Sequence, residues 1–386
     1  MAGAPADPAL LGTPTSVLGG SWTAVLIGIW YFSNFRFGFG LKRASSLFQA
    51  PERCAFLLWV LFAIGWAMAA AARLVYNRIS TTSGAAASQR KEGEAAKAHD
   101  DHEEAAAVAG DRALTMVTHT LGMSFTCLAF ISGSVFKSLA PIFTTIFSMC
   151  YLSAVFPYSA VAAVTLLVGG ATLSSWNTPG FNLAAVLMCM ATNLSLPLRN
   201  VMIKQRTALR QSQLADAGKA GLNSVQLALD TAVDLNFGGM VIMTPLCLIF
   251  TRFSAIPTPD VAIALQLGMH RITYEIASLM VLTRIDAVMH GSLDVLKRAA
   301  MTLIALTSFK SVHPINLAGS VLAFGTLLWY KLSISKQASA GAGGRAFYVP
   351  EKWRVKVGRL LKLLLACLTT CALRMFIQQH TGKCEM

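Results

Sequence analysis

Two adjacent cations, Lys297 and Arg298, lie in a stretch of sequence that is otherwise apolar enough for lipid. An ionisable group at membrane depth is energetically costly, so it usually faces a cavity and serves a function. Two neighbouring cations do not neutralise each other, and they therefore indicate an anionic ligand. Phosphate suits this pair, because lysine supplies a point charge and arginine a planar fork of donors.

The composition places the chain among membrane proteins. Of its 386 residues, 55% are hydrophobic and 13% are charged, whereas a soluble protein has about 25% charged residues. Apolar runs of about twenty residues predict an all-α polytopic protein embedded in a lipid bilayer. The net charge of +14 does not indicate a nucleic-acid partner, because the cations flank apolar spans in the manner of the positive-inside rule.

Hydropathy and flanking charges predict about ten transmembrane helices. Lys and Arg concentrate in the loops after the second and sixth spans and in the C-terminal tail, which predicts that both termini are cytosolic. The ten spans are expected near residues 22–38, 54–76, 113–132, 134–156, 158–175, 180–203, 232–254, 260–282, 286–307 and 312–333.

The ten spans divide into two inverted five-helix repeats. Lys137 in the fourth span and Lys297 in the ninth occupy related places, each after a Ser-containing turn. A transporter built from inverted repeats holds its substrate at the midplane between them. The expected organisation is an N-terminal segment 1–21, repeats 22–175 and 176–334, and a basic tail 335–386.

Three polar regions lie outside these spans. Residues 80–111 and 205–229 are expected to be solvated connectors. In the tail, only residues 363–373 lack charge, which is too short for a span, so 357–378 is expected to be an amphipathic helix on the membrane surface rather than an eleventh span.

Neither a metal nor a cofactor is expected. The acidic cluster Asp100–Glu104 includes His102, but its alanine-rich context is typical of a disordered loop. The eight cysteines lack metal-ligand spacing and are interpreted as reduced packing residues.

Several polar positions in the spans carry a resemblance to a known family. The segment Val135–Pro141 contains Lys137, and a further motif is formed by Asn193, Ser195, Arg199 and Lys204. The most specific motif comprises Tyr274, Arg284, His290, Lys297 and Arg298. Over most of residues 22–334 the chain resembles the phosphate translocators of the drug/metabolite transporter superfamily, which include the triose-phosphate translocators.

This resemblance implies a phosphate site and assigns its residues. Lys137, Lys297 and Arg298 would hold the phosphate group, and Tyr274 would contact the rest of the ligand. His119 and Arg199 are implied as further contacts.

The chain also departs from the family pattern. Ala140, Glu275 and Asp294 stand where the family pattern does not predict them. Glu275 and Asp294 could pair with the cations, or they could change the part of the site that contacts the rest of the ligand. Arg271, one turn before Tyr274, either lines the same cavity or stabilises a helix interaction, and the sequence leaves both interpretations open.

The resemblance implies an antiporter rather than an enzyme. Inorganic phosphate would exchange for a small organic phosphate, with triose phosphate, 3-phosphoglycerate or phosphoenolpyruvate favoured, by alternating access. One alternative is a nucleotide-sugar transporter of the same superfamily. Another is a membrane-embedded transferase with His290 or His119 as a base, which the absence of a paired acid/base motif disfavours.

The expected location combines the resemblance with the first residues. Residues 1–21 contain no Lys or Arg, unlike a cleaved signal or a transit peptide, so the first span is expected to act as its own signal anchor. The resemblance implies a plastid membrane. An outer membrane of a complex plastid such as the apicoplast reconciles both observations, and the Golgi or ER membrane is the alternative.

Overall fold

The computed structural model describes most of the predicted membrane region. The described residues are 17–44, 51–82, 102–128, 139–174, 183–216, 224–251, 258–308, 314–340 and 346–347, with isolated positions between 356 and 370. Lys137 and most of the C-terminal tail lie outside them, so the tail helix stays a prediction.

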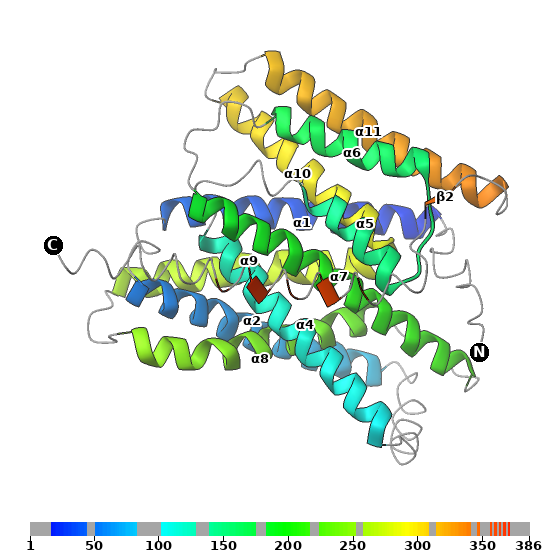
Figure 1. Ribbon diagram of the computed structural model, residues 1–386. Helices are drawn as coiled ribbons and strands as arrows, with labels where there is room; N and C mark the ends of the chain where they lie inside the picture. The colour runs from blue at the N-terminus through cyan, green and yellow to red at the C-terminus, as the bar shows by residue number, and fades with distance from the viewer. Residues whose placement is uncertain are drawn as a thin grey trace.

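The described part of the chain is almost entirely helical (Figure 1). Within the described residues, each apolar segment that the sequence predicts overlaps a helix. The helices are α1 (Val17–Arg43), α2 (Pro51–Thr82), α4 (His102–Leu128), α5 (Ala140–Tyr151), α6 (Tyr158–Ser174), α7 (Leu183–Asp216), α8 (Ser224–Phe250), α9 (Thr258–Arg284), α10 (Ala287–Ser308) and α11 (Pro314–Ala340).

Four of the described helices are long and apolar enough to cross a bilayer. They contain the segments Ser21–Leu41, Arg53–Ser80, Val186–Arg210 and Ser224–Phe250. Large apolar side chains also face outward, and Phe32, Leu248 and Ile249 are each about two-thirds or more exposed. An apolar exterior around buried polar residues is the distribution that a lipid environment favours.

Both predicted connectors are partly helical, which corrects the sequence analysis. Helix α4 begins at His102, inside the expected loop 80–111. Helix α7 continues to Asp216 and α8 begins at Ser224, so most of 205–229 is helix. Hydropathy predicts only the segments that favour lipid. The connectors are rich in Ala, Gln, Arg and Leu, which favour a helix in water as well, so these helices continue beyond the apolar segments.

The all-α prediction misses one short pair of strands. Helix α5 ends at Tyr151, before the expected end at residue 156. Ser153 then adopts a positive φ of 53°, and the chain enters strand β1 (Phe156–Pro157). This strand pairs antiparallel with β2 (Ala346–Phe347). The pairing joins residues so far apart in the chain that local sequence does not reveal it.

The helices pack in pairs drawn from the two halves of the chain. Helix α2 lies along α8, α1 along α9, α4 along α7, α5 along α10 and α6 along α11. Figure 1 shows α6 beside α11 at one edge of the bundle and α2 beside α8 toward the other. The residues that form the candidate site therefore come together from both halves.

Gly170 allows α6 and α11 to approach each other closely. A Cβ atom at this position would lie 2.7 Å from the backbone N of Ala323 and 2.8 Å from the carbonyl O of Gly319. Both atoms belong to the backbone of α11 and cannot rotate away. Small residues at such crossings are how membrane helices gain close packing.

Candidate anion-binding site

The polar centre of the bundle is built around Arg199 of α7. Its Nη1 lies 2.8 Å from Nδ1 of His119 on α4, and its Nε and Nη2 donate to Oδ1 of Asn200 at 3.1 and 2.7 Å. A guanidinium group only donates hydrogen bonds. The Nδ1 atom of His119 therefore accepts, and the proton of the neutral ring lies on Nε2.

Arg271 and Glu275 of α9 complete this network. Arg271 Nη1 donates to the carbonyl of Leu61 and to Oδ1 of Asn236, both at 2.8 Å, and its Nη2 lies 3.0 Å from Glu275 Oε2. The other carboxylate oxygen of Glu275 lies 3.0 Å from His119 Nε2. Arg271 and Glu275 are 1% and 4% exposed, so this ion pair is well shielded from solvent and joins α9 to α2, α4 and α8.

Asn200 connects Arg199 with a second polar cluster around His290. The amide Nδ2 of Asn200 lies 3.4 Å from His290 Nδ1, and His290 Nε2 lies 2.9 Å from Oγ of Ser278. Because an amide NH₂ donates, His290 Nδ1 accepts and its Nε2–H faces Ser278. The imidazole also stacks on Trp30 of α1, with ring centroids 4.6 Å apart. Polar contacts thus run from α7 to α9 and α10.

Lys297 of α10 lies next to this second cluster. Its side chain is 4% exposed, and its Nζ lies 2.7 Å from Oδ1 of Asp294. The ammonium group also lies 4.9 Å from the centre of the Trp30 ring, within cation–π range. Arg298 follows on the same helix, but its side chain lies outside the described part of the structure.

The charges of this centre favour an anion. Three cations, Arg199, Arg271 and Lys297, face two carboxylates, Glu275 and Asp294. The two carboxylates are paired with Arg271 and Lys297. Within the described residues, no carboxylate lies within ion-pair distance of Arg199. A buried cation without a carboxylate partner is a place where an anionic ligand gains most.

The structure brings together several of the predicted site residues. His119, Arg199 and Lys297 belong to the connected polar centre. Among the described residues, the hydroxyl of Tyr274 makes no hydrogen bond to this centre; it donates to Met123 Sδ at 3.5 Å, and its ring packs on Phe37. Lys137 lies outside the described residues. The roles of all these residues in binding stay proposals.

The sequence analysis does not identify every member of the centre. Arg271, whose role the sequence analysis leaves undecided, is a central member. Its spacing of four residues from Glu275 in an apolar segment is the pattern that indicates an ion pair within one helix. Asn200, Asn236, Ser278 and Trp30 were not identified. Single amides, hydroxyls and aromatic rings are common in membrane helices, so no local pattern distinguishes these four.

Taken together, the helical bundle, its apolar exterior and its buried ionised centre define a polytopic membrane protein with an intramembrane polar site. The particular family is also clear. The chain belongs to the Triose-phosphate Transporter family, which matches residues 21–331.

Plant translocators are among the similar curated proteins. The chain is 26% identical over 220 residues to a triose phosphate/phosphate translocator of non-green plastids from Brassica oleracea var. botrytis, covering 55% of this chain and 54% of that protein. It is 25% identical over 220 residues to phosphoenolpyruvate/phosphate translocator 1 of Arabidopsis thaliana, covering 55% and 53%. The chain therefore matches about half the length of these curated relatives, which are named as chloroplastic.

Proposed function

We propose that this protein exchanges inorganic phosphate for a small phosphorylated metabolite across a membrane. The observation that carries the proposal is the buried centre in which, among the described residues, Arg199, Arg271 and Lys297 are accompanied by two carboxylates, Glu275 and Asp294. A phosphate dianion supplies the missing negative charge, and both exchange partners carry that group. Triose phosphate, 3-phosphoglycerate and phosphoenolpyruvate are the favoured organic substrates, and the names of the relatives include triose phosphate and phosphoenolpyruvate.

In this proposal the phosphate group binds between the two halves of the chain. Lys297 and Arg298 of α10 form one side, and Lys137 forms the other. Arg199 and His119 extend the site toward α4 and α7, and Tyr274 borders it from α9. The pairing of Lys297 with Asp294 means that phosphate has to compete with this carboxylate for the ammonium group.

The packing of the helices supports two inverted five-helix repeats that rock against each other. Exchanging each helix of the first half with its counterpart in the second half turns the pair α1–α9 into the pair α4–α7. The same exchange leaves the pairs α2–α8, α5–α10 and α6–α11 unchanged. Such a pseudo-twofold pattern is the basis of alternating access around a central site.

Two other functions are less well supported. A nucleotide-sugar transporter would need a nucleobase pocket in addition to a phosphate site, and the named relatives carry small phosphates. A membrane-embedded transferase is disfavoured because the family and these relatives are transporters or translocators.

A plastid membrane is the proposed location, because the plant relatives are chloroplastic. The more specific proposal is an outer membrane of a complex plastid such as the apicoplast. Imaging a tagged full chain against markers for each plastid membrane tests this proposal, and a signal confined to the Golgi or ER overturns it.

Counter-exchange in reconstituted vesicles tests the transport function. Purified protein is placed in vesicles loaded with labelled phosphate, and unlabelled phosphate, triose phosphate, 3-phosphoglycerate, phosphoenolpyruvate or a nucleoside monophosphate is added outside. We expect label to leave only when a small phosphate is supplied. Export driven equally by the nucleoside monophosphate supports the nucleotide-sugar alternative, and no counter-exchange with any phosphate contradicts the proposal.

A further inference from the structure

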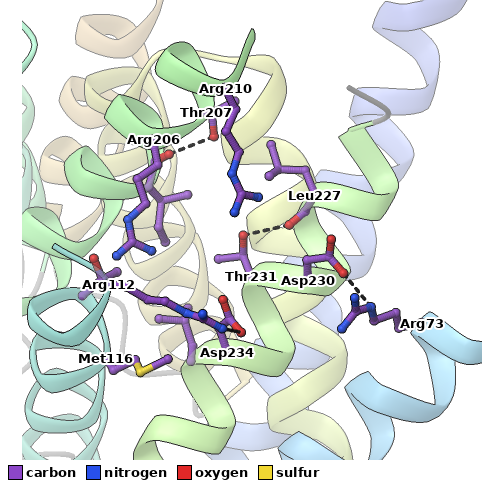
Figure 2. Close-up of a pocket in the computed structure, with 13 residues that line it drawn as sticks. Arg73, Arg112, Met116, Arg206, Thr207, Arg210, Leu227, Asp230, Thr231 and Asp234 are labelled. Atoms are coloured by element: carbon purple, nitrogen blue, oxygen red, sulfur yellow. Dashed lines mark hydrogen bonds and ion pairs between the residues drawn. The ribbon is translucent and has the colours of Figure 1, made fainter. Parts of the chain in front are cut away.

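A cation-rich cavity lies at one end of the bundle, away from the central site. It has a volume of about 190 Å³ and is bordered by α2, α4, α7 and α8. Four arginines and two aspartates line it, as Figure 2 shows. These charged residues are Arg73, Arg112, Arg206, Arg210, Asp230 and Asp234.

Both aspartates of this cavity are engaged by arginines of other helices. Arg73 Nε lies 2.7 Å from Asp230 Oδ1, and Arg112 Nη2 lies 2.5 Å from Asp234 Oδ1. These ion pairs join α2 and α4 to α8. The cavity therefore keeps a surplus of positive charge, which comes from the two arginines of α7.

Arg206 borders this cavity and has unsatisfied donors. Its Nε and Nη2 atoms are buried and have no hydrogen-bond acceptor among the described residues. Figure 2 shows its guanidinium group and that of Arg210 reaching from α7 toward the space beside Arg112 and Thr231. A buried donor without an acceptor is rare in a folded protein, and a guanidinium fork matches two oxygens of a phosphate group.

Three threonines line the cavity, and each donates its hydroxyl proton to a backbone carbonyl: Thr115 Oγ1 donates to the carbonyl of Asp111 at 2.6 Å. Thr207 Oγ1 donates to the carbonyl of Ile203 at 2.8 Å, and Thr231 Oγ1 donates to the carbonyl of Leu227 at 2.7 Å. Each hydroxyl proton is therefore used within its own helix. Recognition here rests on charge and on the guanidinium fork.

We propose that this cavity is a second anion site, which binds a phosphate group before it reaches the central site. Arg206 and Arg210, about one helical turn apart on α7, supply the positive charge that holds the phosphate group. A volume of about 190 Å³ is below the roughly 300–1,000 Å³ of pockets for larger organic ligands. The ligand class is therefore inorganic phosphate or a small phosphate ester.

The position of the cavity gives it a role in transport, an inference that rests on the proposed function. Arg206 follows Arg199 by seven residues on α7, which corresponds to about two helical turns or roughly 10 Å. On α8, Asp234 at the cavity and Asn236 in the central network are two residues apart. An anion that leaves the cavity along these helices meets the central site next. The positive-inside rule predicts that this end faces the cytosol.

Counter-exchange measured from each face of the membrane tests the role in transport. We expect Arg206→Gln to raise the half-saturating phosphate concentration roughly tenfold from the cavity face, with a similar maximal rate and no change from the opposite face. Arg78→Gln is the matched control, because it removes one cation from the same end of α2 but does not line the cavity. An unchanged half-saturation, or equal changes on both faces, overturns this role.

Direct binding separates this proposal from the proposed function. Inorganic phosphate is titrated into purified protein that carries Lys297→Ala and Arg298→Ala, with and without Arg206→Gln. We expect the protein with Lys297→Ala and Arg298→Ala to bind phosphate weakly, and the additional Arg206→Gln substitution to remove this binding. The result does not depend on whether the unaltered chain shows counter-exchange. Equal binding with and without that substitution contradicts the site.

A lipid headgroup offers the same phosphate chemistry and has to be distinguished. The titration is repeated in nanodiscs of phosphatidylcholine and of phosphatidylglycerol. Binding of phosphate in phosphatidylcholine supports a site for soluble anions. Binding of phosphatidylglycerol that depends on Arg206, without binding of inorganic phosphate, overturns the proposal in favour of a lipid site.

Discussion

The guanidinium group of Arg199 lies 2.8 Å from Nδ1 of His119, across the interface between α7 and α4. Because arginine only donates, His119 Nδ1 accepts in this contact, which places the proton of a neutral imidazole on Nε2, the atom that lies 3.0 Å from Glu275 Oε1. A neutral histidine adds no further positive charge to a centre that already holds three cations. The contact also orients Arg199, whose charge is not compensated by a direct carboxylate partner among the described residues.

Removal of the Lys297 charge should slow exchange strongly without unfolding the protein. We expect Lys297→Gln to lower the rate of phosphate counter-exchange about 30-fold or more, because a buried charged contact to the ligand is lost. Lys297→Arg keeps the charge and should retain part of the rate. Thermal unfolding in detergent serves as the folding control, and a normal rate in a well-folded Lys297→Gln protein contradicts the role of this lysine.

Asp294 should act as a competitor of the ligand for Lys297. Its Oδ1 atom lies 2.7 Å from Lys297 Nζ, so Asp294→Asn removes a negative charge that phosphate has to displace. We expect the half-saturating phosphate concentration to fall roughly three- to tenfold. An increase instead would show that Asp294 positions Lys297 for binding, and the pairing would then be part of the site.

Glu275 should matter for stability as well as for transport. Glu275→Gln preserves shape but leaves Arg271 buried without its carboxylate partner. The loss of one partner of a buried ion pair costs about 3–5 kcal/mol, so we expect a lower midpoint of thermal unfolding.

A double-mutant cycle checks the cause of this destabilisation. Arg271→Gln combined with Glu275→Gln removes both charges and should recover part of the lost stability. If the two single effects simply add, the ion pair is not the reason for the destabilisation.

Two neighbouring glycines of α6 provide a matched test of helix packing. A Cβ at Gly170 would contact the backbone of α11 at 2.7 Å, whereas Gly169 has no atom within 4 Å of its Cβ position. We expect Gly170→Ala to destabilise the protein by about 1–3 kcal/mol, and Gly169→Ala to stabilise it by about 0.5–1 kcal/mol. Thermal unfolding of the two variants measures the contrast. Equal effects would show that α6 and α11 do not pack this closely in the membrane.

The order of the helices could be predicted from sequence because each helix carries its own apolar run. The ends of several helices could not, since hydropathy ends where charge begins, whereas α4, α7 and α8 extend through residues that favour a helix in water. The strand pair of Phe156 and Phe347 depends on chain segments that are far apart. No local pattern contains that information.

The sequence by itself determined the membrane class and the helical segments, because each helix carries its own apolar run. It also identified Lys297 as a candidate site residue, because a charge within an apolar run can be recognised without knowing the fold. Only the tertiary structure decided which charges meet. It paired Arg271 with Glu275, placed His119 between that pair and Arg199, and set Asp294 against Lys297. It also gathered the arginines of three helices around the cavity at Arg206. These contacts depend on how the helices rotate and cross, which is set by the packing of whole helix faces rather than by any one segment.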